Sequence, residues 1–336
     1  MIDAGKLTED TLVVHAKKIP NIELKQEINL INEIRSPNYF AFIQKDDLTH
    51  FNGFKDKLIH ANFKSNSSTS YLKIPLSEIR SIHLPKSSFR YVKIGSNGRQ
   101  KSIIPSIIPI DENLGELLGY YISEGHISKR IKNGNPFYYI TFSSASREMH
   151  DRIQFLSNEL FDLNVYTLDR LKDAGSYVST LHAKILKHLF MDLLKCGKNS
   201  KSKQIPPFIL SSNESVKKSF INAYMDGDGN IKKDMPSSVP LGRYTTNSKS
   251  LNEDLILLKR QEGVKTNTYI RNKDKTYNTR MINYFKGNKE CFSDCFAIPP
   301  KKIEIVDSTS DYVYDISVKD NENFVDVNGG IVLHNT

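Results

Sequence analysis

Two acidic residues, each followed by a glycine, stand at the end of two similar stretches of this chain. Glu124 lies near the end of ENLGELLGYYISEG, and Asp228 lies near the end of KSFINAYMDGDG, 104 residues further on. If the fold brings them together, their carboxylates are ligands for divalent cations that activate water and stabilise the leaving oxygen in phosphodiester hydrolysis. Without a cation the two negative charges repel each other. The alternative is a duplicated α/β domain in which both acids face solvent.

Both stretches have the apolar spacing of a buried helix. The residues on the apolar face are Leu114, Leu117, Leu118, Tyr121 and Ile122 in the first stretch and Val216, Phe220, Ile221, Tyr224 and Met225 in the second. Gly119 and Ala223 match at the same offset of 104 residues. Small residues at this place let two helices approach closely, so we expect the acids to project from adjacent helix ends.

The repeat continues beyond the acids. YYITFSSAS and GRYTTNSKS align at the same offset, and they end on Ser146 and Ser250. Each serine is expected to cap the helix that follows, at 147–161 and 251–260. The sequence therefore predicts a unit of helix, strands and helix that is used twice.

The chain as a whole is basic, with 47 Lys and Arg against 38 Asp and Glu and a net charge of +9. The Lys-rich segments 193–218 and 259–275 suit contacts with nucleic-acid phosphates, although a solvated basic surface explains them equally well. Neither a run of about 18 apolar residues nor a signal segment occurs, so we expect a soluble cytoplasmic protein rather than a membrane protein. Cys196, Cys291 and Cys295 form no pair of CxxC zinc motifs, and we expect reduced thiols.

With these residues in place, the middle of the chain resembles the LAGLIDADG homing endonucleases. LLGYYISEG (117–125) and INAYMDGDG (221–229) stand where that family has its two signature motifs. The resemblance implies that Glu124 and Asp228 are catalytic acids that bind Mg²⁺, and that Asp226 is a structural residue at the helix end.

A further block and one departure complete this resemblance. SKQIPPFI (202–209) is similar to the lysine-containing block of intein-borne members, which implies that Lys203 lies near the scissile phosphate. The first motif has Ser123 and Glu124 instead of Asp-Ala-Asp, which leaves one carboxylate where one is needed. The resemblance also implies a monomer whose two curved antiparallel sheets bind double-stranded DNA in the major groove.

The last residues suggest a different chemistry. His334, Asn335 and Thr336 follow GGIVLH, a strand-like run that ends on the histidine. An asparagine amide can attack its own backbone carbonyl, which forms a succinimide and cuts the chain, and a neighbouring histidine can move the proton. The alternative is an accidental HNT after an ordinary β-hairpin, in which VYDISV (313–318) pairs with GGIVLH.

With VYDISV and NENFVDVNGGIVLHN beside it, this end resembles the carboxyl-terminal splicing blocks of an intein. The implied roles are cyclisation for Asn335, assistance for His334, the acceptor nucleophile at the start of the downstream extein for Thr336, and organisation of proton transfers for Asp315. The resemblance implies no cofactor for these steps.

The amino-terminal end resembles the upstream junction with one defect. TEDTLVV (8–14) is similar to the first intein strand, and the opening nucleophile, normally Cys, Ser or Thr, corresponds to Ala4. A methyl group cannot attack a carbonyl. Three explanations stay open: an engineered replacement of the nucleophile, a native alanine-first intein in which Thr336 attacks directly, or a shifted alignment. No Thr-x-x-His block occurs either, and His83 is the histidine we nominate in its place.

Together the patterns predict a bifunctional intein of mixed fold class, with an all-β Hint (hedgehog/intein) splicing domain and an α/β LAGLIDADG endonuclease domain of two repeats. The expected division is an extein remnant (1–3), splicing domain (4–107), endonuclease (108–302), splicing domain (303–335) and the first downstream extein residue (336). Ile-Asp before Ala4 and Thr after Asn335 fit insertion into an archaeal family B DNA polymerase. The expected partners are the flanking exteins and the host DNA site without the insert. The rival hypothesis is a LAGLIDADG DNA-binding protein that has lost cleavage.

Overall fold

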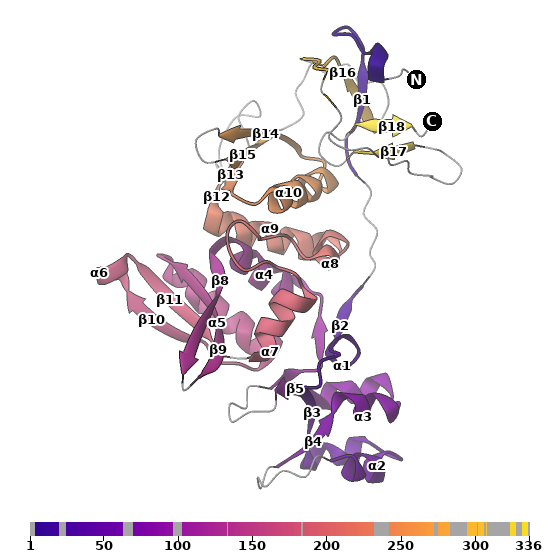
Figure 1. The fold of residues 1–336 in the computed structure, drawn as a ribbon, viewed down its shortest axis with the longest axis vertical. Helices are drawn as coiled ribbons and strands as arrows, with labels where there is room; N and C mark the ends of the chain where they lie inside the picture. The colour runs from indigo at the N-terminus through magenta and orange to yellow at the C-terminus, as the bar shows by residue number, and fades with distance from the viewer. Residues whose placement is uncertain are drawn as a thin grey trace. The chain divides into compact units, whose positions relative to one another are not determined.

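The computed structural model describes residues 4–19, 25–62, 70–96, 103–132, 134–182, 184–231, 242–271, 275–282, 294–300, 302–305, 307, 323–326 and 331–334. The chain forms two compact units (Figure 1). The central unit comprises residues 22–228, and the terminal unit combines residues 1–21 with residues 229–336. Among the helices of the described ranges, none is long and apolar enough to cross a membrane.

The central unit begins with a small α/β module, residues 25–109. Its antiparallel sheet has the strand order β4-β3-β5-β6, and β2 pairs with β7 where the chain enters and leaves the module. The elements are β2 (Glu27–Asn29), α1 (Leu30–Glu33), β3 (Tyr39–Gln44), η2 (Lys45–His50), α2 (Lys55–His60), β4 (Tyr71–Pro75), α3 (Leu76–Ser81), η3 (Lys86–Tyr91), β5 (Val92–Ser96), β6 (Ile104–Pro105) and β7 (Ile107–Pro109).

The helices of this module differ from the all-β arrangement that we expected within residues 4–107. Leu76 and Ile79 lie three positions apart, are almost fully buried, and give α3 an apolar side that packs against β3 and β4. Leu58 does the same for α2 against β4. One or two buried apolar residues per helix are too few to show a helical period, so the sequence pattern did not predict these short helices.

The first repeat follows the module. The elements are α4 (Glu112–Glu124), β8 (Gly125–Lys132), β9 (Asn135–Ser144), α5 (Arg147–Phe161), β10 (Tyr166–Arg170), α6 (Leu171–Ala174) and β11 (Ser176–Leu181). The antiparallel sheet has the order β10-β11-β9-β8, and α5 covers one face of it. The central unit then ends with α7 (Lys184–Lys187), the π-helical η4 (His188–Leu193), α8 (Pro207–Leu210) and α9 (Glu214–Asp228).

The second repeat has the same order of strands and long helices, without a counterpart of α6 among the described residues, and it belongs to the terminal unit after α9. Its elements are β12 (Gly229–Ile231), β13 (Gly242–Thr246), α10 (Lys249–Gln261), β14 (Lys265–Arg271) and β15 (Thr276–Ile282). The sheet order is β12-β13-β15-β14, so in both repeats the first two strands pair and the fourth strand lies between the second and the third. The predicted duplication is confirmed at the level of topology.

The alignment of the repeats beyond the acids was wrong by two residues. Gly125 pairs with Phe142 and Gly229 pairs with Tyr244, so the offset is 104 at the glycines but 102 at their strand partners. Ser146 caps α5 as predicted, by accepting a hydrogen bond from the amide of Met149. Ser248, not Ser250, caps α10. A shift of two residues keeps every side chain on the same face of a strand, so the alternating pattern could not detect it.

The paired helices α4 and α9 form the core of the central unit. All ten apolar residues predicted for their faces are buried. A Cβ atom at Gly115 would come within 2.6 Å of the carbonyl oxygen of Val216, and one at Gly119 within 2.7 Å of the Cβ of Ala223. The two helices therefore approach as closely as the matched small residues indicated.

The two ends of the chain lie together in the terminal unit. Its remaining elements are η1 (Ala4–Lys6), β1 (Val13–Ala16), β16 (Cys295–Ile298), β17 (Asn323–Val325) and β18 (Val332–His334). β1 pairs with β16, and His15 forms an isolated bridge with Ile331, directly before β18. Among the described strands, β18 pairs with β17. VYDISV lies outside the described residues, so its predicted pairing with GGIVLH stays a prediction. The predicted limits of the splicing and endonuclease parts stay predictions.

Candidate functional site

The two predicted metal ligands lie at the adjacent ends of α4 and α9. Glu124 is the last residue of α4, and Asp228 is the last residue of α9. A Cβ atom at Gly227 would come within 2.5 Å of the Cβ of Ser123 and 3.1 Å of the Cγ of Glu124, so the helix ends are in contact. The fold therefore brings together two carboxylates that are 104 positions apart in the sequence.

Lys203 reaches the same helix end from a separate loop. Its Nζ donates a hydrogen bond of 2.8 Å to the carbonyl oxygen of Ser123, and the residue is 6% exposed. Tyr121 anchors the loop, because its hydroxyl donates to the carbonyl oxygen of Gly197 at 2.8 Å. Gly197 has a φ of 80°, and a Cβ there would meet the backbone of Ser202. Glycine at this turn is thus required for Lys203 to reach the site.

The charges of the three residues act on one another. Desolvation raises the pKa of Asp228 to about 6, the nearby Lys203 opposes this, and Glu124 adds to it. Asp228 keeps solvent contact, but the packed helix ends still surround its carboxylate with enough protein to disfavour the charge. Desolvation likewise raises the pKa of Glu124, and it lowers that of Lys203 to about 8. Each of the three charged forms is therefore disfavoured by burial.

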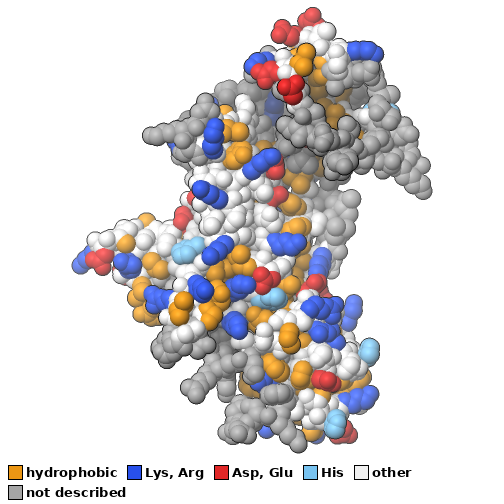
Figure 2. Space-filling view, viewed as in Figure 1, with side chains coloured by type: hydrophobic (Ala, Val, Ile, Leu, Met, Phe, Trp, Pro, Cys, Tyr) orange, Lys and Arg blue, Asp and Glu red, His pale blue; other side chains and the backbone are white. Residues whose placement is uncertain are grey.

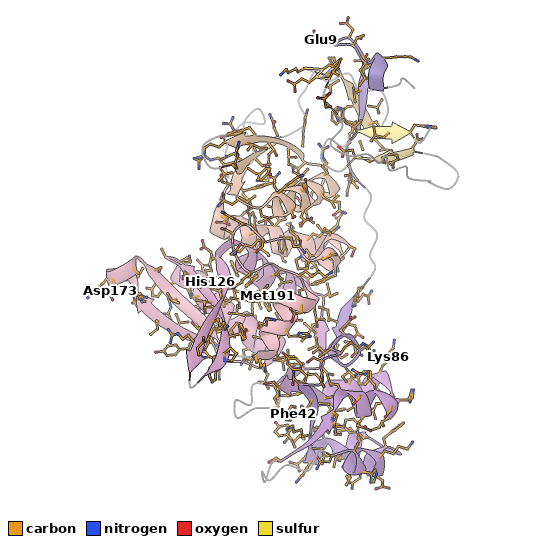
Figure 3. The ribbon with its side chains drawn as sticks, in the orientation of Figure 1. Glu9, Phe42, Lys86, His126, Asp173 and Met191 are labelled. Carbon is orange, nitrogen blue, oxygen red and sulfur yellow. The ribbon has the colours of Figure 1, made fainter. Side chains whose placement is uncertain are left out.

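His126 is a member of this cluster that the sequence patterns did not single out. It is the second residue of β8, directly after Glu124-Gly125, and its position is labelled in Figure 3. Desolvation first, and then the charge of Lys203, lower its pKa, so it is neutral at pH 7. A neutral imidazole can accept as well as donate a hydrogen bond. Its place immediately after the first acidic motif is the signal that could have identified it.

This arrangement can hold a divalent cation with help from other ligands. Carboxylate oxygens are what Mg²⁺ prefers, and a cation between Glu124 and Asp228 would relieve the repulsion that raises the pKa of Asp228. Within the described ranges, no group of three or more His, Cys, Asp or Glu side chains could hold a metal ion. Water and phosphate oxygens are the further ligands that Mg²⁺ commonly keeps at phosphate sites.

The basic segments are not uniform surface patches. Four of their cations are buried, and these are Lys203, Lys217, Lys259 and Arg260, with exposures of 3% to 8%. Lys259 forms an ion pair with Glu262 at 2.7 Å. On the face shown in Figure 2, Lys and Arg side chains are scattered over the surface. Lys217, Lys259 and Arg260 are too enclosed to form part of a basic surface for phosphate contacts, whereas Lys203 lies at the α4–α9 site.

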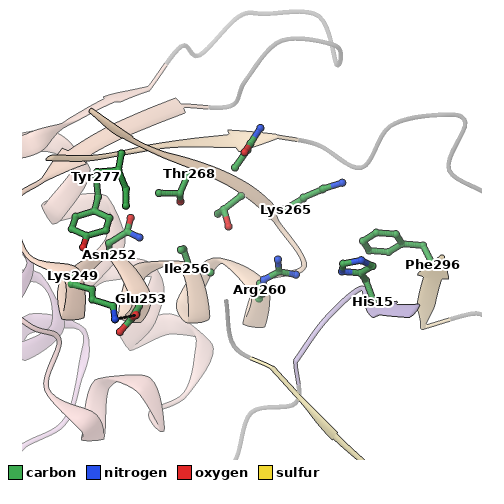
Figure 4. A pocket seen from close by; sticks show the side chains of 13 residues that line it. His15, Lys249, Asn252, Glu253, Ile256, Arg260, Lys265, Thr268, Tyr277 and Phe296 are labelled. Carbon is green, nitrogen blue, oxygen red and sulfur yellow. Dashed lines mark ion pairs between the residues drawn. The ribbon is translucent and has the colours of Figure 1, made fainter. Parts of the chain in front are cut away.

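The terminal unit contains a cavity of about 460 Å³ on the helix side of its sheet (Figure 4). Arg260 of α10 and Lys265 of β14 line it, together with His15, whose ring stacks on Phe296 at 5.2 Å. The Nζ of Lys265 lies 5.4 Å from the centre of the Phe296 ring. Neither acid of the α4–α9 site nor Lys203 lines this cavity.

The residues predicted for splicing are only partly described. His334 is the last residue of β18, paired with Asn323, and is half-buried. Ala4 begins η1. Asp315, Asn335 and Thr336 lie outside the described residues. The structure thus does not test whether these residues meet.

Residues 111–190 and 215–293 match the family model described as a LAGLIDADG-like domain. These two segments are LAGLIDADG-like. They coincide with the two repeats, and each contains one of the two acids at the end of its first helix. The LAGLIDADG-like domain has the α/β fold that we expected, with α4 and α9 as its paired first helices.

Two curated relatives from Methanocaldococcus jannaschii have different names. A DNA polymerase is 26% identical over 333 residues, which are 98% of this chain and 18% of the polymerase. Transcription initiation factor IIB is 31% identical over 239 residues, which are 68% of this chain and 31% of the factor. The chain therefore spans a third or less of the length of these relatives.

Among solved structures, the homing endonuclease I-DmoI in complex with DNA and Mn is 18% identical, with a TM-score of 0.40 over 51% of this chain and 90% of its own.

Proposed function

We propose that the LAGLIDADG-like domain cleaves double-stranded DNA with Mg²⁺ held by Glu124 and Asp228. The observation that carries this proposal is the contact between the ends of α4 and α9, which sets two carboxylates beside the buried Lys203. Desolvation and mutual repulsion of carboxylates destabilise the folded state, and acidic residues on an ordinary surface are not arranged in this way. A cluster of carboxylates with such costs is typical of a functional site, where the arrangement is set by the reaction rather than by stability.

Each side chain has its own part in the proposed reaction. Glu124 and Asp228 would hold Mg²⁺, which would lower the pKa of a bound water and neutralise negative charge at the leaving oxygen. Lys203 has a pKa of about 8 and is mostly protonated at pH 7, so it donates hydrogen bonds to the scissile phosphate and can return a proton to the leaving oxygen. Its bond to Ser123 fixes the direction of its ammonium group.

The open faces of the two sheets are the proposed DNA-contacting surfaces. α5 and α10 each cover one face of their own sheet, which leaves the opposite face to solvent. On the open face of β12–β15, Arg243, Asn267 and Arg280 are exposed. A twisted β-ribbon of this kind fits the major groove, where polar side chains distinguish all four base pairs.

Cleavage of a randomised duplex library tests this proposal. The intact chain is incubated with the library in Mg²⁺, and the cut ends are captured and sequenced. We expect discrete sites that are cut in Mg²⁺ but not in EDTA. Glu124→Gln and Asp228→Asn are expected to lose at least about a hundredfold in rate, while Asp226→Asn, the matched control at the same helix end, retains cleavage. Specific binding in Ca²⁺ without any cleavage in Mg²⁺ would instead favour the rival DNA-binding protein.

We also propose that the terminal segments excise this chain from a host protein by splicing. A specific observation supports this second function: relatives as different in name as a DNA polymerase and a transcription initiation factor each match most of this chain over only 18% to 31% of their own length. A shared segment within unrelated hosts is what a self-excising insert produces. The bridge between His15 and Ile331 further supports it, because it joins the two terminal segments.

The proposed splicing chemistry takes place at His334, Asn335 and Thr336. The Thr336 hydroxyl attacks the carbonyl carbon of the upstream junction and forms an ester with the upstream segment. The bond that joined this segment to residue 4 breaks, and the hydroxyl proton passes to the group of residue 4 that leaves. The Asn335 amide nitrogen then attacks its own backbone carbonyl, His334 protonates the departing amine, and an ester-to-amide shift follows. Ala4 stands at the position of the first nucleophile, and its methyl side chain cannot act as one. Asp315 is proposed to organise the proton transfers.

Intact mass after fusion of host-like flanks tests the splicing proposal. With Ala4→Ser, we expect ligated flanks and a free excised segment of residues 4–335, and Asn335→Ala is expected to stop release of the downstream flank. Ligation by the unmodified chain would assign direct attack to Thr336. A precursor that stays whole in both forms would refute splicing and leave the DNA-cleavage proposal untouched.

A further inference from the structure

One sheet face in the central unit, outside both repeats and the α4–α9 site, combines aromatic rings with lysines. It belongs to the sheet β4-β3-β5-β6 of the module formed by residues 25–109. The helices α2 and α3 pack on the other face, where Ala41 and Ile43 of β3 are fully buried. Because successive side chains of a strand point to opposite faces, Phe40 and Phe42 of β3 belong to the face away from these helices.

Phe42 stands between two lysines in the middle of this face. Its partners in the neighbouring strands are Lys73 of β4 and Lys93 of β5. Since paired strands lie about 4.8 Å apart, the two lysines begin roughly 10 Å apart, one on each side of the ring. Phe42 is half-buried, and its position is labelled in Figure 3. Tyr71, two residues before Lys73 in β4, is also half-buried and adds a second ring to the same face.

Both lysines are held at the face by contacts with their surroundings. The Nζ of Lys73 lies 4.4 Å from the centre of the ring of Phe40. The Nζ of Lys93 donates a hydrogen bond of 2.5 Å to Asp162, the residue that follows α5. The side chain of Asp162 is 64% exposed, and exposed ion pairs are weak. A phosphate group can therefore replace this carboxylate at Lys93 with little loss.

The module also carries most of the net charge of the chain. Residues 25–109 contain 13 Lys and Arg against 6 Asp and Glu, which gives +7 of the total of +9. The rest of the chain, with both repeats, is therefore close to neutral. An excess of this kind attracts a polyanion. The module thus has a charge that its own fold does not require.

We propose that this face binds single-stranded nucleic acid, with an unpaired base stacked on Phe42 and the flanking phosphates at Lys73 and Lys93. Rings that alternate with cations fit such a strand, because every unpaired base exposes a flat π-face and every nucleotide a negative charge. Bases within a duplex are stacked on one another and cannot reach a ring on a sheet. The site is separate from Glu124 and Asp228, so this inference goes beyond the proposed function and does not depend on it.

The chain contains no tryptophan, so Phe42→Trp gives the protein a single indole at the proposed stacking position. We expect its fluorescence to be quenched by an oligothymidylate or an oligouridylate of about twelve nucleotides, and the strand that binds more tightly identifies DNA or RNA as the source. Phe54→Trp is the matched control. Phe54 is half-buried in the same module and lies 5.8 Å from the Nζ of Lys57, but it caps α2 and should not be quenched.

Fluorescence anisotropy of labelled oligonucleotides measures the contributions of ring and charge. Phe42→Leu keeps an apolar side chain and is expected to weaken binding roughly fivefold to a hundredfold, because stacking is lost. Lys73→Gln and Lys93→Gln should each reduce the slope of log affinity against log salt by about 0.7. Lys57→Gln removes an exposed charge from α2 and is expected to leave this slope unchanged. Circular dichroism verifies that each variant is folded.

Two results would overturn the inference. If Phe42→Trp is not quenched, or Phe42→Leu binds like wild type, the lysines serve only to cover the aromatic rings. If inorganic polyphosphate binds as tightly as the oligothymidylate, charge alone explains the binding. All measurements are made in EDTA, where the proposed DNA cleavage does not occur. Quenching in a chain that cuts no DNA would therefore support this inference while the proposed function fails, and the reverse combination is equally distinguishable.

Discussion

Replacement of Asp228 by asparagine is expected to stabilise the protein while abolishing DNA cleavage. In the folded chain, burial and the neighbouring Glu124 raise the pKa of Asp228 to about 6, despite the opposing charge of Lys203. In the unfolded chain an aspartate ionises near its ordinary value of about 4. Ionisation of Asp228 therefore lowers the free energy of unfolding, and replacement by a neutral amide removes this destabilisation.

The magnitude follows from the difference in pKa. One pKa unit corresponds to about 1.4 kcal/mol, so a difference of about two gives at most roughly 3 kcal/mol. Asp228 keeps contact with solvent, which screens its charge, so we expect a gain of about 1 kcal/mol. Below about pH 4 aspartate is protonated in both states and the gain is absent. It develops between pH 4 and 6 and is complete above pH 6.

Urea unfolding of wild type and Asp228→Asn at pH 4 and pH 7.5 measures this directly. Asp226→Asn is the control, since it removes the same charge at an exposed position of the same helix end and is expected to change stability by less than about 0.5 kcal/mol. An equal gain at both pH values, or none at pH 7.5, would refute the reasoning. Mg²⁺ at ten times its Kd should stabilise wild type by about 1.4 kcal/mol, and Asp228→Asn by less.

The remaining predictions concern the same helix pair, the caps and the buried lysine. Gly119→Val is expected to destabilise the chain by about 1–3 kcal/mol in denaturant unfolding, because a side chain there overlaps α9. Ser248→Ala should cost about 1 kcal/mol and Ser250→Ala less than about 0.5, and the reverse order would contradict the two-residue shift. Lys203→Met should slow cleavage at least about a hundredfold without weakening DNA binding in Ca²⁺. Cleavage by wild type should decline below pH 6 as Asp228 becomes protonated.

Local periodicity was sufficient to predict the helices that carry the acids. The apolar faces of α4 and α9 repeat every three to four residues, and the small residues Gly119 and Ala223 indicated where the helices meet. This succeeded because helix burial depends on neighbours within two turns. The short helices of residues 25–109 escaped prediction, since four to six residues contain too few periodic positions. The cap at Ser248 escaped because strand register depends on the pairing partner, not on the local sequence.

The sequence by itself determined which residues could do chemistry: two carboxylates in matched motifs, one lysine in a separate block, and the His-Asn-Thr triplet. Residue types and spacing are properties of the chain, so they can be recognised without coordinates. Only the tertiary structure decided that Ser123 binds Lys203, that Gly227 lets the helix ends touch, and that several lysines of the basic segments are buried. Burial and proximity arise from packing between distant segments, and they set the pKa values on which the proposed reaction depends.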